Sequence, residues 1–426
     1  MFLANSHVCM LLVCFFSRVP SFPCNFFFTM SLLEVITKAS ANREHTGIQS
    51  EYPIILDPHD VFPNLKPKLE NPDNALIASP VTGWQLSETD SQVIELAKKL
   101  YAKLKRRLKD NNKFDKDEFI GILNQFLDKL RRRVGISVGV SSSDDGYTRV
   151  LIEKVGSLMG RDVTVLVLEA CLRLEMWDLL ETLIVNGIVD HSSYSNLVMS
   201  LSAKKRSDLL CLSIKHAPDL GLSELLCILK YFLSPSKDAH STMMIVRKEW
   251  ESQALLAIEK VKDENLSDKK LLVGKEASIL LMLAHDGFST SELCLHYLLA
   301  SPNVDEVILS SAVGKLNGKE TISLIRYLGK WLKKYEMFPQ ATPCPKASSM
   351  LGLKACDWVP RLEDIVRCLG LVLDVNFSSL VLHPEFHEEL KSTEAIVGSL
   401  ASEAKHCCSV ANVLENLRTN AKGEQN

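Results

Sequence analysis

Apolar residues recur at helical spacing along most of the chain. The first clear stripe begins after Ser87 and comprises Val93, Ala97, Leu100, Leu104 and Leu108, which stand three or four residues apart. A second apolar face predicts a helix over 115–134, so 87–134 is expected to form a helical hairpin. The stretch 135–149 is rich in Gly, Ser and Asp, which predicts a linker.

The pattern predicts a helical domain over 150–338. Its apolar faces fall at 162–187, 191–202, 205–216, 221–233, 242–262, 268–285, 289–300, 303–315 and 318–336. Val163 to Leu168 is β-branched enough for a strand, but helical spacing continues to Leu183, which favours a helix. Short polar breaks between helices are typical of bundles and α-solenoids. Since the repeats have no fixed length, the sequence predicts an all-α fold, an irregular α-solenoid or helical bundle.

The N-terminal region follows a different pattern. Residues 30–86 are rich in proline, which biases each preceding residue to extended geometry and predicts an extended connector. Residues 1–29 are apolar and contain the run Val8 to Phe16, which no Lys or Arg precedes. A signal peptide has a basic residue there, so an upstream start or a gene-model artefact is the preferred interpretation, with a secretory signal as the alternative.

The C-terminal region predicts one long helix. Prolines and serines at 339–360 indicate a loop, and the segment 361–420 follows it with a helix near 361–373. Pro384 suits a first helical residue, and the last helix is predicted over 384–418. Its seam is spaced by three and four residues and includes Phe386, Leu390, Val397, Leu400 and Leu414. Such a seam predicts packing along a partner helix.

Composition narrows the class of protein. The 426 residues carry 49 Lys and Arg against 52 Asp and Glu, so the formal charge is −3 and no global basic field is present. A hydrophobic content of 46% and a charged content of 24% are those of a globular protein. No apolar run is long enough for a membrane span. The 12 cysteines form no C-x-x-C pair, which favours a reducing compartment, the cytosol or nucleus.

Motifs that imitate catalytic sites fail on spacing. The segment 314–320 resembles a phosphate loop but has three residues between its glycines, where four are needed. The segment 383–387 resembles a zinc-protease helix, but Pro384 stands where the motif needs its glutamate. We therefore predict no catalytic, metal-binding or cofactor-binding residue, no small-molecule ligand and no enzymatic activity.

One charge asymmetry stands out. Between residues 98 and 133 there are 13 Lys and Arg against 5 Asp and Glu, a local charge of 13 − 5 = +8. The candidate residues are Lys98, Lys99, Lys103, Lys105, Arg106, Arg107, Arg131, Arg132 and Arg133. Three interpretations remain open: a face that contacts RNA phosphates, a nuclear-import element and a solvated helix face. No aromatic platform is interleaved, so base-specific reading is not expected.

Four stretches carry a resemblance to a known family. They are Trp-Gln-Leu-Ser-Glu-Thr-Asp at 84–90, Met-Trp-Asp-Leu-Leu-Glu-Thr-Leu-Ile at 176–184, the leucine-rich segment 222–233, and 369–382 with its Asp-Val-Asn-Phe turn. Together they resemble the C-terminal helical region of the nucleolar protein 11 family over about residues 50–418. The resemblance implies a component of the t-UTP subcomplex of the small-subunit processome. Family members carry an N-terminal β-propeller, for which the preceding residues leave no room, so propeller-borne contacts are not expected.

The expected function follows from this resemblance. It implies a non-enzymatic helical scaffold in the nucleolus that supports pre-rRNA transcription and early processing. Its partners would be other t-UTP and processome subunits, bound through helical surfaces, with pre-rRNA contacted through 98–133. The alternative is a helical adaptor of another pathway, such as trafficking or protein degradation, because solenoids serve many partners.

Overall fold

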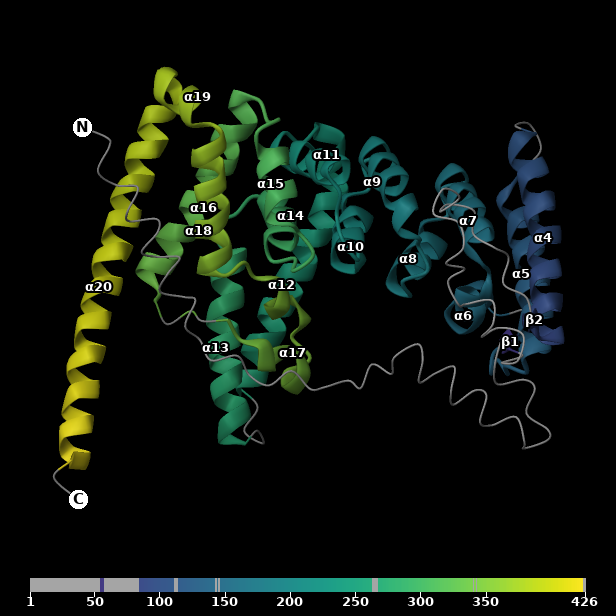
Figure 1. The fold of residues 1–426 in the computed structure, drawn as a ribbon, viewed down its shortest axis with the longest axis horizontal. Helices are drawn as coiled ribbons and strands as arrows, with labels where there is room; N and C mark the ends of the chain where they lie inside the picture. The colour runs from purple at the N-terminus through teal and green to yellow at the C-terminus, as the bar shows by residue number, and fades with distance from the viewer. Residues whose placement is uncertain are drawn as a thin grey trace, which may run out of the picture. The chain divides into compact units, whose positions relative to one another are not determined.

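The fold is all-α, as the periodicity predicts. The computed structural model describes residues 54–56, 84–110, 114–141, 144, 146–262, 267–339, 341 and 343–423. Its only described strands, β1 (Ile54–Leu56) and β2 (Trp84–Leu86), pair antiparallel with Ile54 opposite Leu86. Apart from these strands, the predicted 1–29 extension and the 30–86 connector lie outside the described residues. The described residues divide into two compact units, one that ends at Val189 and one that begins at Asp190 (Figure 1).

The first unit contains the predicted basic hairpin. Its helices are α4 (Glu88–Lys109), α5 (Lys116–Val134), α6 (Tyr147–Val155), α7 (Arg161–Arg173) and α8 (Trp177–Val185), with the 3-10 turn η3 (Gly156–Leu158) after α6. Ser87 caps α4, because its hydroxyl accepts the backbone N–H of Asp90, and the Asp115 carboxylate caps α5 by accepting the N–H of Glu118. Gly135, at φ 76°, ends α5 in the left-handed conformation that glycine favours.

The domain boundary differs from the predicted one. The sequence placed a linker at 135–149, but α6 begins inside it at Tyr147 and packs on α5, while α7 packs on α4. Tyr147 is buried, and its hydroxyl donates to Asp128 Oδ1 at 2.7 Å. The helices α6 to α8 therefore belong with the hairpin, and the boundary falls between Val189 and Asp190.

The second unit contains the remaining described helices. They are α9 (Tyr194–Ala203), α10 (Ser207–His216), α11 (Leu222–Leu233), α12 (His240–Lys262), α13 (Asp268–His285), α14 (Thr290–Leu299), α15 (Glu306–Val313), α16 (Gly318–Met337), α17 (Pro345–Leu351), α18 (Leu362–Val375), α19 (Phe377–Leu382) and α20 (His387–Gly423). The 3-10 turns are η4 (His191–Ser193), η5 (Lys237–Ala239), η6 (Lys354–Trp358) and η7 (Pro384–Phe386). Most helices pack on others close in sequence, such as α9 on α11 and α12 on α13, as in a solenoid (Figure 1).

The predicted loop at 339–360 contains two short helices. Pro345 stands at the first turn of α17, where its fixed φ suits a helix start, and Gly352 ends α17 at φ 72°. Ala347 and Leu351 are buried, so this punctuated stretch folds against the unit. Pro345 therefore marks a helix start and not an open loop, and the stretch lies within the second unit.

An aromatic cluster forms the centre of the second unit. Four of its side chains are at most 1% exposed: Trp250, His296, Tyr327 and Trp331. His296 Nδ1 lies 2.8 Å from Tyr327 Oη, and its Nε2 lies 3.0 Å from the carbonyl oxygen of Ala284. The Trp331 indole N–H donates to the same Tyr327 hydroxyl at 3.2 Å. These bonds leave each polar ring atom of His296 with a partner, which is what a buried imidazole requires.

Two helix ends carry a non-glycine residue in the left-handed region. Glu175, at φ 54°, divides the single helix predicted over 162–187 into α7 and α8, and Lys205, at φ 59°, follows α9. After each helix the backbone closes a Schellman turn, in which Met176 N donates to Cys171 O and Arg206 N donates to Leu201 O. A side chain in this conformation costs roughly 1 to 2 kcal/mol that glycine avoids.

We predict that Lys205→Gly stabilises the protein. Relief of the left-handed strain is expected to raise the free energy of unfolding by about 1 kcal/mol, and the thermal unfolding midpoint rises with it. The matched control is Ala203→Gly in the last turn of α9, which is expected to lower stability by up to about 1 kcal/mol. A fall in the Lys205→Gly midpoint would contradict the strain that we assign to this turn.

Candidate interaction surfaces

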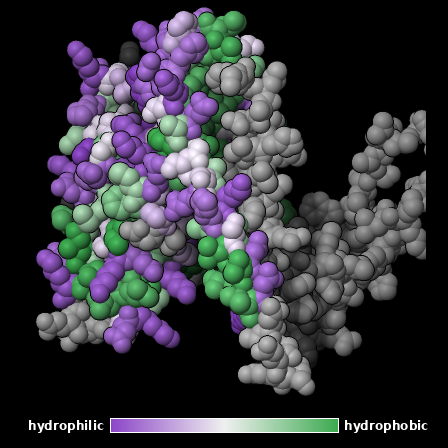
Figure 2. All heavy atoms as spheres, turned by 90° about the vertical axis from the view of Figure 1, so that its left-hand side faces the viewer, coloured by the Kyte–Doolittle hydropathy of each residue, from purple (hydrophilic) through white to green (hydrophobic). Residues whose placement is uncertain are grey.

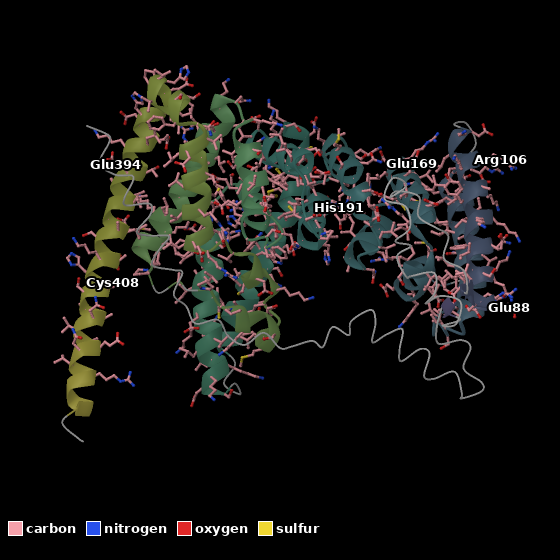
Figure 3. All side chains as sticks on the ribbon, viewed as in Figure 1. Glu88, Arg106, Glu169, His191, Glu394 and Cys408 are labelled. Carbon is pink, nitrogen blue, oxygen red and sulfur yellow. The ribbon has the colours of Figure 1, made fainter. Side chains whose placement is uncertain are left out.

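The basic residues of α4 lie on its exposed side. Leu100, Leu104 and Leu108 are buried against the first unit, which turns the opposite side of the helix to solvent. Six cations lie on that side, and we call them the α4 ridge: Lys98, Lys99, Lys103, Lys105, Arg106 and Lys109, all exposed. In Figure 3, Arg106 lies near one end of α4 and Glu88 near the other, so the ridge occupies the C-terminal half.

The two basic clusters of the sequence lie at opposite ends of the hairpin. Because α4 and α5 run antiparallel, Arg107 reaches the start of α5, where its Nη2 lies 2.8 Å from Glu118 Oε1. At the other end, Arg133 Nη1 donates to Gln92 Oε1 at 2.6 Å. Fifteen residues of helix separate Gln92 from Arg107, a rise of about 22 Å. The predicted nine residues therefore do not make a single compact patch.

Some of the predicted basic residues already form ion pairs or hydrogen bonds within the protein. Arg131 Nε donates to Asp128 Oδ1 at 2.6 Å, and that oxygen also accepts the Tyr147 hydroxyl. Partial burial acts to raise the pKa of Asp128, but the bonds from Tyr147 and Arg131 outweigh it, so this pKa is lowered. Arg131 and Tyr147 thus hold a charged carboxylate that ties α5 to α6, which is a structural role.

The basic residues of the α4 ridge have fewer partners among the described residues than Arg107, Arg131 and Arg133. Lys98 makes an exposed pair with Glu95 at 3.3 Å, and Lys105 bonds the Tyr101 hydroxyl, which raises the lysine's pKa. Within the described part of the chain, Lys99, Lys103, Arg106 and Lys109 have neither an ion pair nor a side-chain hydrogen bond. Like charges three and four residues apart on one helix repel each other, so this arrangement favours an anionic partner.

The last helix, α20, packs along only part of its length. It has 37 residues, a length of about 55 Å, whereas its main neighbour α16 has 20 residues and spans about 30 Å. Thr393 is buried, and Arg326 of α16 pairs with Glu389 at 2.5 Å. A Cβ at Gly329 of α16 would lie 3.7 Å from Thr393 Oγ1, an ordinary contact distance, so the two helices pack closely at this point.

The predicted seam therefore divides into two parts. Phe386 is buried in η7, and Leu390, Val397 and Leu400 are half-buried, on the part of the seam that packs within the chain. Leu414, in contrast, is 61% exposed. From Ser402 to Arg418 every side chain is exposed except Cys408, which is half-buried.

The exposed half of α20 carries an apolar stripe of which the predicted seam includes only Leu414. Val410, Val413, Leu414 and Leu417 stand at i, i+3, i+4 and i+7, and each is more than half exposed. We call these four residues the α20 stripe. Since each residue turns the helix by about 100°, the stripe is rotated from the packed seam, which would continue through Cys408 and Ala411. Figure 2 shows hydrophobic surface on this side of the molecule among hydrophilic residues.

The motifs that imitate catalytic sites have structural roles. Asn317 caps α16 and forms a reciprocal capping box with Glu320, so the phosphate-loop imitation is a helix start. His387 Nε2 lies 3.1 Å from the carbonyl oxygen of Val381. Across the described ranges, no group of three or more His, Cys, Asp and Glu side chains is arranged to hold a metal ion. Within the same ranges, no helix is both long and apolar enough to cross a membrane.

Comparison with known proteins adds no assignment. No protein-family model and no curated protein sequence matches the chain. Two exposed surfaces of the described residues, the α4 ridge in the first unit and the α20 stripe in the second, stand as candidate sites for recognition.

Proposed function

We propose that the protein is a non-enzymatic helical scaffold that binds partner proteins through helix faces. The proposal depends on one observation. The C-terminal half of α20 extends beyond α16, and the apolar stripe on this half of α20 is exposed. An isolated helix of this length, rich in Val, Cys, Ser and Asn, is marginal in water, so packing against a partner would stabilise it. Four apolar side chains at helical spacing are what a partner helix buries.

We further propose that the partners are t-UTP and processome subunits in the nucleolus. Support comes from the resemblance of 84–90, 176–184, 222–233 and 369–382 to the nucleolar protein 11 family. The scaffold would then serve pre-rRNA transcription and early processing. An irregular solenoid also suits an adaptor of trafficking or protein degradation, and the bound partners distinguish the two.

The test is affinity purification of the tagged chain from cells, with its bound proteins and RNAs identified. The variant Val410→Asp, Leu414→Asp, Leu417→Asp charges the α20 stripe and leaves the α16-facing seam untouched. We expect it to lose the partner proteins that the wild type recovers, since burying an unpaired carboxylate is costly. The matched control, Lys405→Asp with Asn412→Asp, makes the same change of −3 in net charge on the opposite face of the same half-helix and is expected to keep them.

Each outcome bears on one part of the proposal. Recovery of t-UTP subunits and pre-rRNA by the wild type supports the processome scaffold. Recovery of trafficking or ubiquitin machinery instead would replace it with the adaptor function. If the stripe variant keeps every partner of the wild type, the role assigned to α20 is wrong.

A further inference from the structure

The six ridge cations form two rows along α4. Lys98, Lys105 and Lys109 stand at i, i+7 and i+11, and Lys99, Lys103 and Arg106 stand at i, i+4 and i+7. At about 100° per residue, both rows run parallel to the helix axis, roughly 100° apart around it. Ala102, which is exposed and small, lies between the rows.

We propose that the α4 ridge binds the phosphate backbone of double-stranded RNA. In an A-form duplex, two phosphate strands border a deep and narrow major groove. Two rows of cations on one helix match two rows of phosphates, one row to each strand. Long lysine side chains suit such contacts because a phosphate can be met as a point charge without fixed geometry.

The composition of the ridge disfavours other anionic partners. An interface with a protein usually has an apolar centre, and a helix on a membrane buries an apolar face. The ridge itself contains no large apolar residue. Ile94, 38% exposed, lies one turn before Lys98, and Val134 lies at the end of α5. Single-stranded binding commonly uses aromatic platforms, and the ridge offers none, because Tyr101 is half-buried and holds Lys105.

Nuclear import is also a weaker interpretation of this segment. A basic signal read as an extended peptide would have to leave α4, and α4 buries Leu100, Leu104 and Leu108. The folded hairpin presents the cations as a ridge on a fixed helix, which suits a duplex surface. The choice of RNA over DNA rests on the proposed nucleolar function, whereas the geometry itself stands apart from it.

The test measures binding of the full chain to a fluorescein-labelled 20-base-pair RNA duplex by anisotropy. With four to six phosphate contacts, the slope of log affinity against log salt is expected near −4 to −5. Wild-type affinity should then fall several-hundred-fold between 50 and 200 mM salt. In the ridge variant Lys99→Gln, Lys103→Gln, Arg106→Gln, Lys109→Gln, we expect at least tenfold weaker binding at 150 mM salt and a fall of only about tenfold over the same range.

Two controls keep the result specific. The variant Lys262→Gln, Lys269→Gln, Lys270→Gln, Lys275→Gln removes four exposed lysines from α12 and α13, with the same change of net charge, and is expected to bind as the wild type does. Gln is a good helix former and removes like-charge repulsion, so the ridge variant is expected to keep its helical circular dichroism spectrum. The variant Arg131→Gln, Arg132→Gln, Arg133→Gln changes the other end of the hairpin and should weaken binding less than the ridge variant.

Three results would overturn the proposal. They are no binding by the wild type, equal binding by the ridge variant and the α12–α13 control, or equal affinity for a DNA duplex of the same sequence. This experiment uses purified protein and leaves the α20 stripe unchanged. Failure here with partner recovery intact would remove the RNA site alone, whereas loss of the partner proteins with RNA binding intact would remove the scaffold proposal alone.

Discussion

Replacing Trp331 by alanine is expected to lower the free energy of unfolding of the second unit by about 3 to 5 kcal/mol. The Trp331 ring is 1% exposed, and its centroid lies 4.9 Å from Phe288, 5.0 Å from His296 and 5.6 Å from Tyr335. Truncation would leave a large cavity among rings that α14, α16 and the turn before α14 hold in place, so the surroundings can collapse only in part. It would also remove the indole donor from the Tyr327 hydroxyl.

The measurement is urea unfolding followed by far-UV circular dichroism. The transition of Trp331→Ala should move to lower urea, and the amides of α14 and α16 should exchange hydrogen faster than in the wild type. The control is Val307→Ala on α15, where the side chain is 74% exposed and the expected change is within about 0.5 kcal/mol. A shift as small as that of the control would show that the cluster does not anchor the unit.

The helices of this protein could be predicted because their apolar residues are close together in sequence. Residues 163–168 show this well, since β-branched residues suggested a strand and the spacing through Leu183 favoured a helix, which α7 confirms. Local periodicity reports which residues share a helix face. It carries no information about which other helix covers that face.

That limit explains the domain boundary. The Gly- and Ser-rich stretch at 135–149 has the composition of a linker, but a hydroxyl–carboxylate bond from Tyr147 to Asp128 packs α6 onto α5. The break in the helix predicted over 162–187 could not be predicted either, because Glu175 adopts a left-handed conformation that glutamate rarely takes. The first feature is a tertiary contact and the second is a local backbone turn, and composition reports neither.

The candidate surfaces were predictable in part. The sequence identified the cations, but only the antiparallel path of α4 and α5 places Lys105 to Arg107 and Arg131 to Arg133 at opposite ends. On α20 the seam through Leu400 was found from its three- and four-residue spacing. The stripe at Val410, Val413, Leu414 and Leu417 has the same spacing and could have been found. It was missed because the predicted seam was continued as a single line to Leu414.

Acid is expected to destabilise the second unit through His296. Burial lowers the pKa of His296 to about 3, with a smaller effect from Lys334 in the same direction. In the unfolded chain the imidazole has an ordinary pKa near 6.5. Above pH 6.5 both states are neutral, and below it the unfolded state binds a proton that the folded state refuses. Stability therefore falls as pH decreases from about 6.5 toward 3, and His296 accounts for about 3 kcal/mol of the loss by pH 4.

The variant His296→Leu isolates this contribution. Removing the imidazole leaves the carbonyl oxygen of Ala284 without its partner, so the variant should be less stable than the wild type at pH 7.5. Its loss of stability between pH 6.5 and 4, however, should be smaller by about 3 kcal/mol. His216 and His285, whose pKa values burial also lowers, remain in both proteins and cancel in the difference.

A second variant separates titration from general damage to the cluster. Tyr327→Phe removes the hydroxyl that bonds both His296 and Trp331 but keeps the imidazole buried. It should therefore lower stability at every pH and keep the wild-type steepness between pH 6.5 and 4, because burial is the main cause of the lowered pKa. Unfolding free energies of the three proteins across pH 4 to 7.5 give the comparison. If His296→Leu is as steep as the wild type, the acid sensitivity arises elsewhere, and His296 contributes only packing and hydrogen bonds.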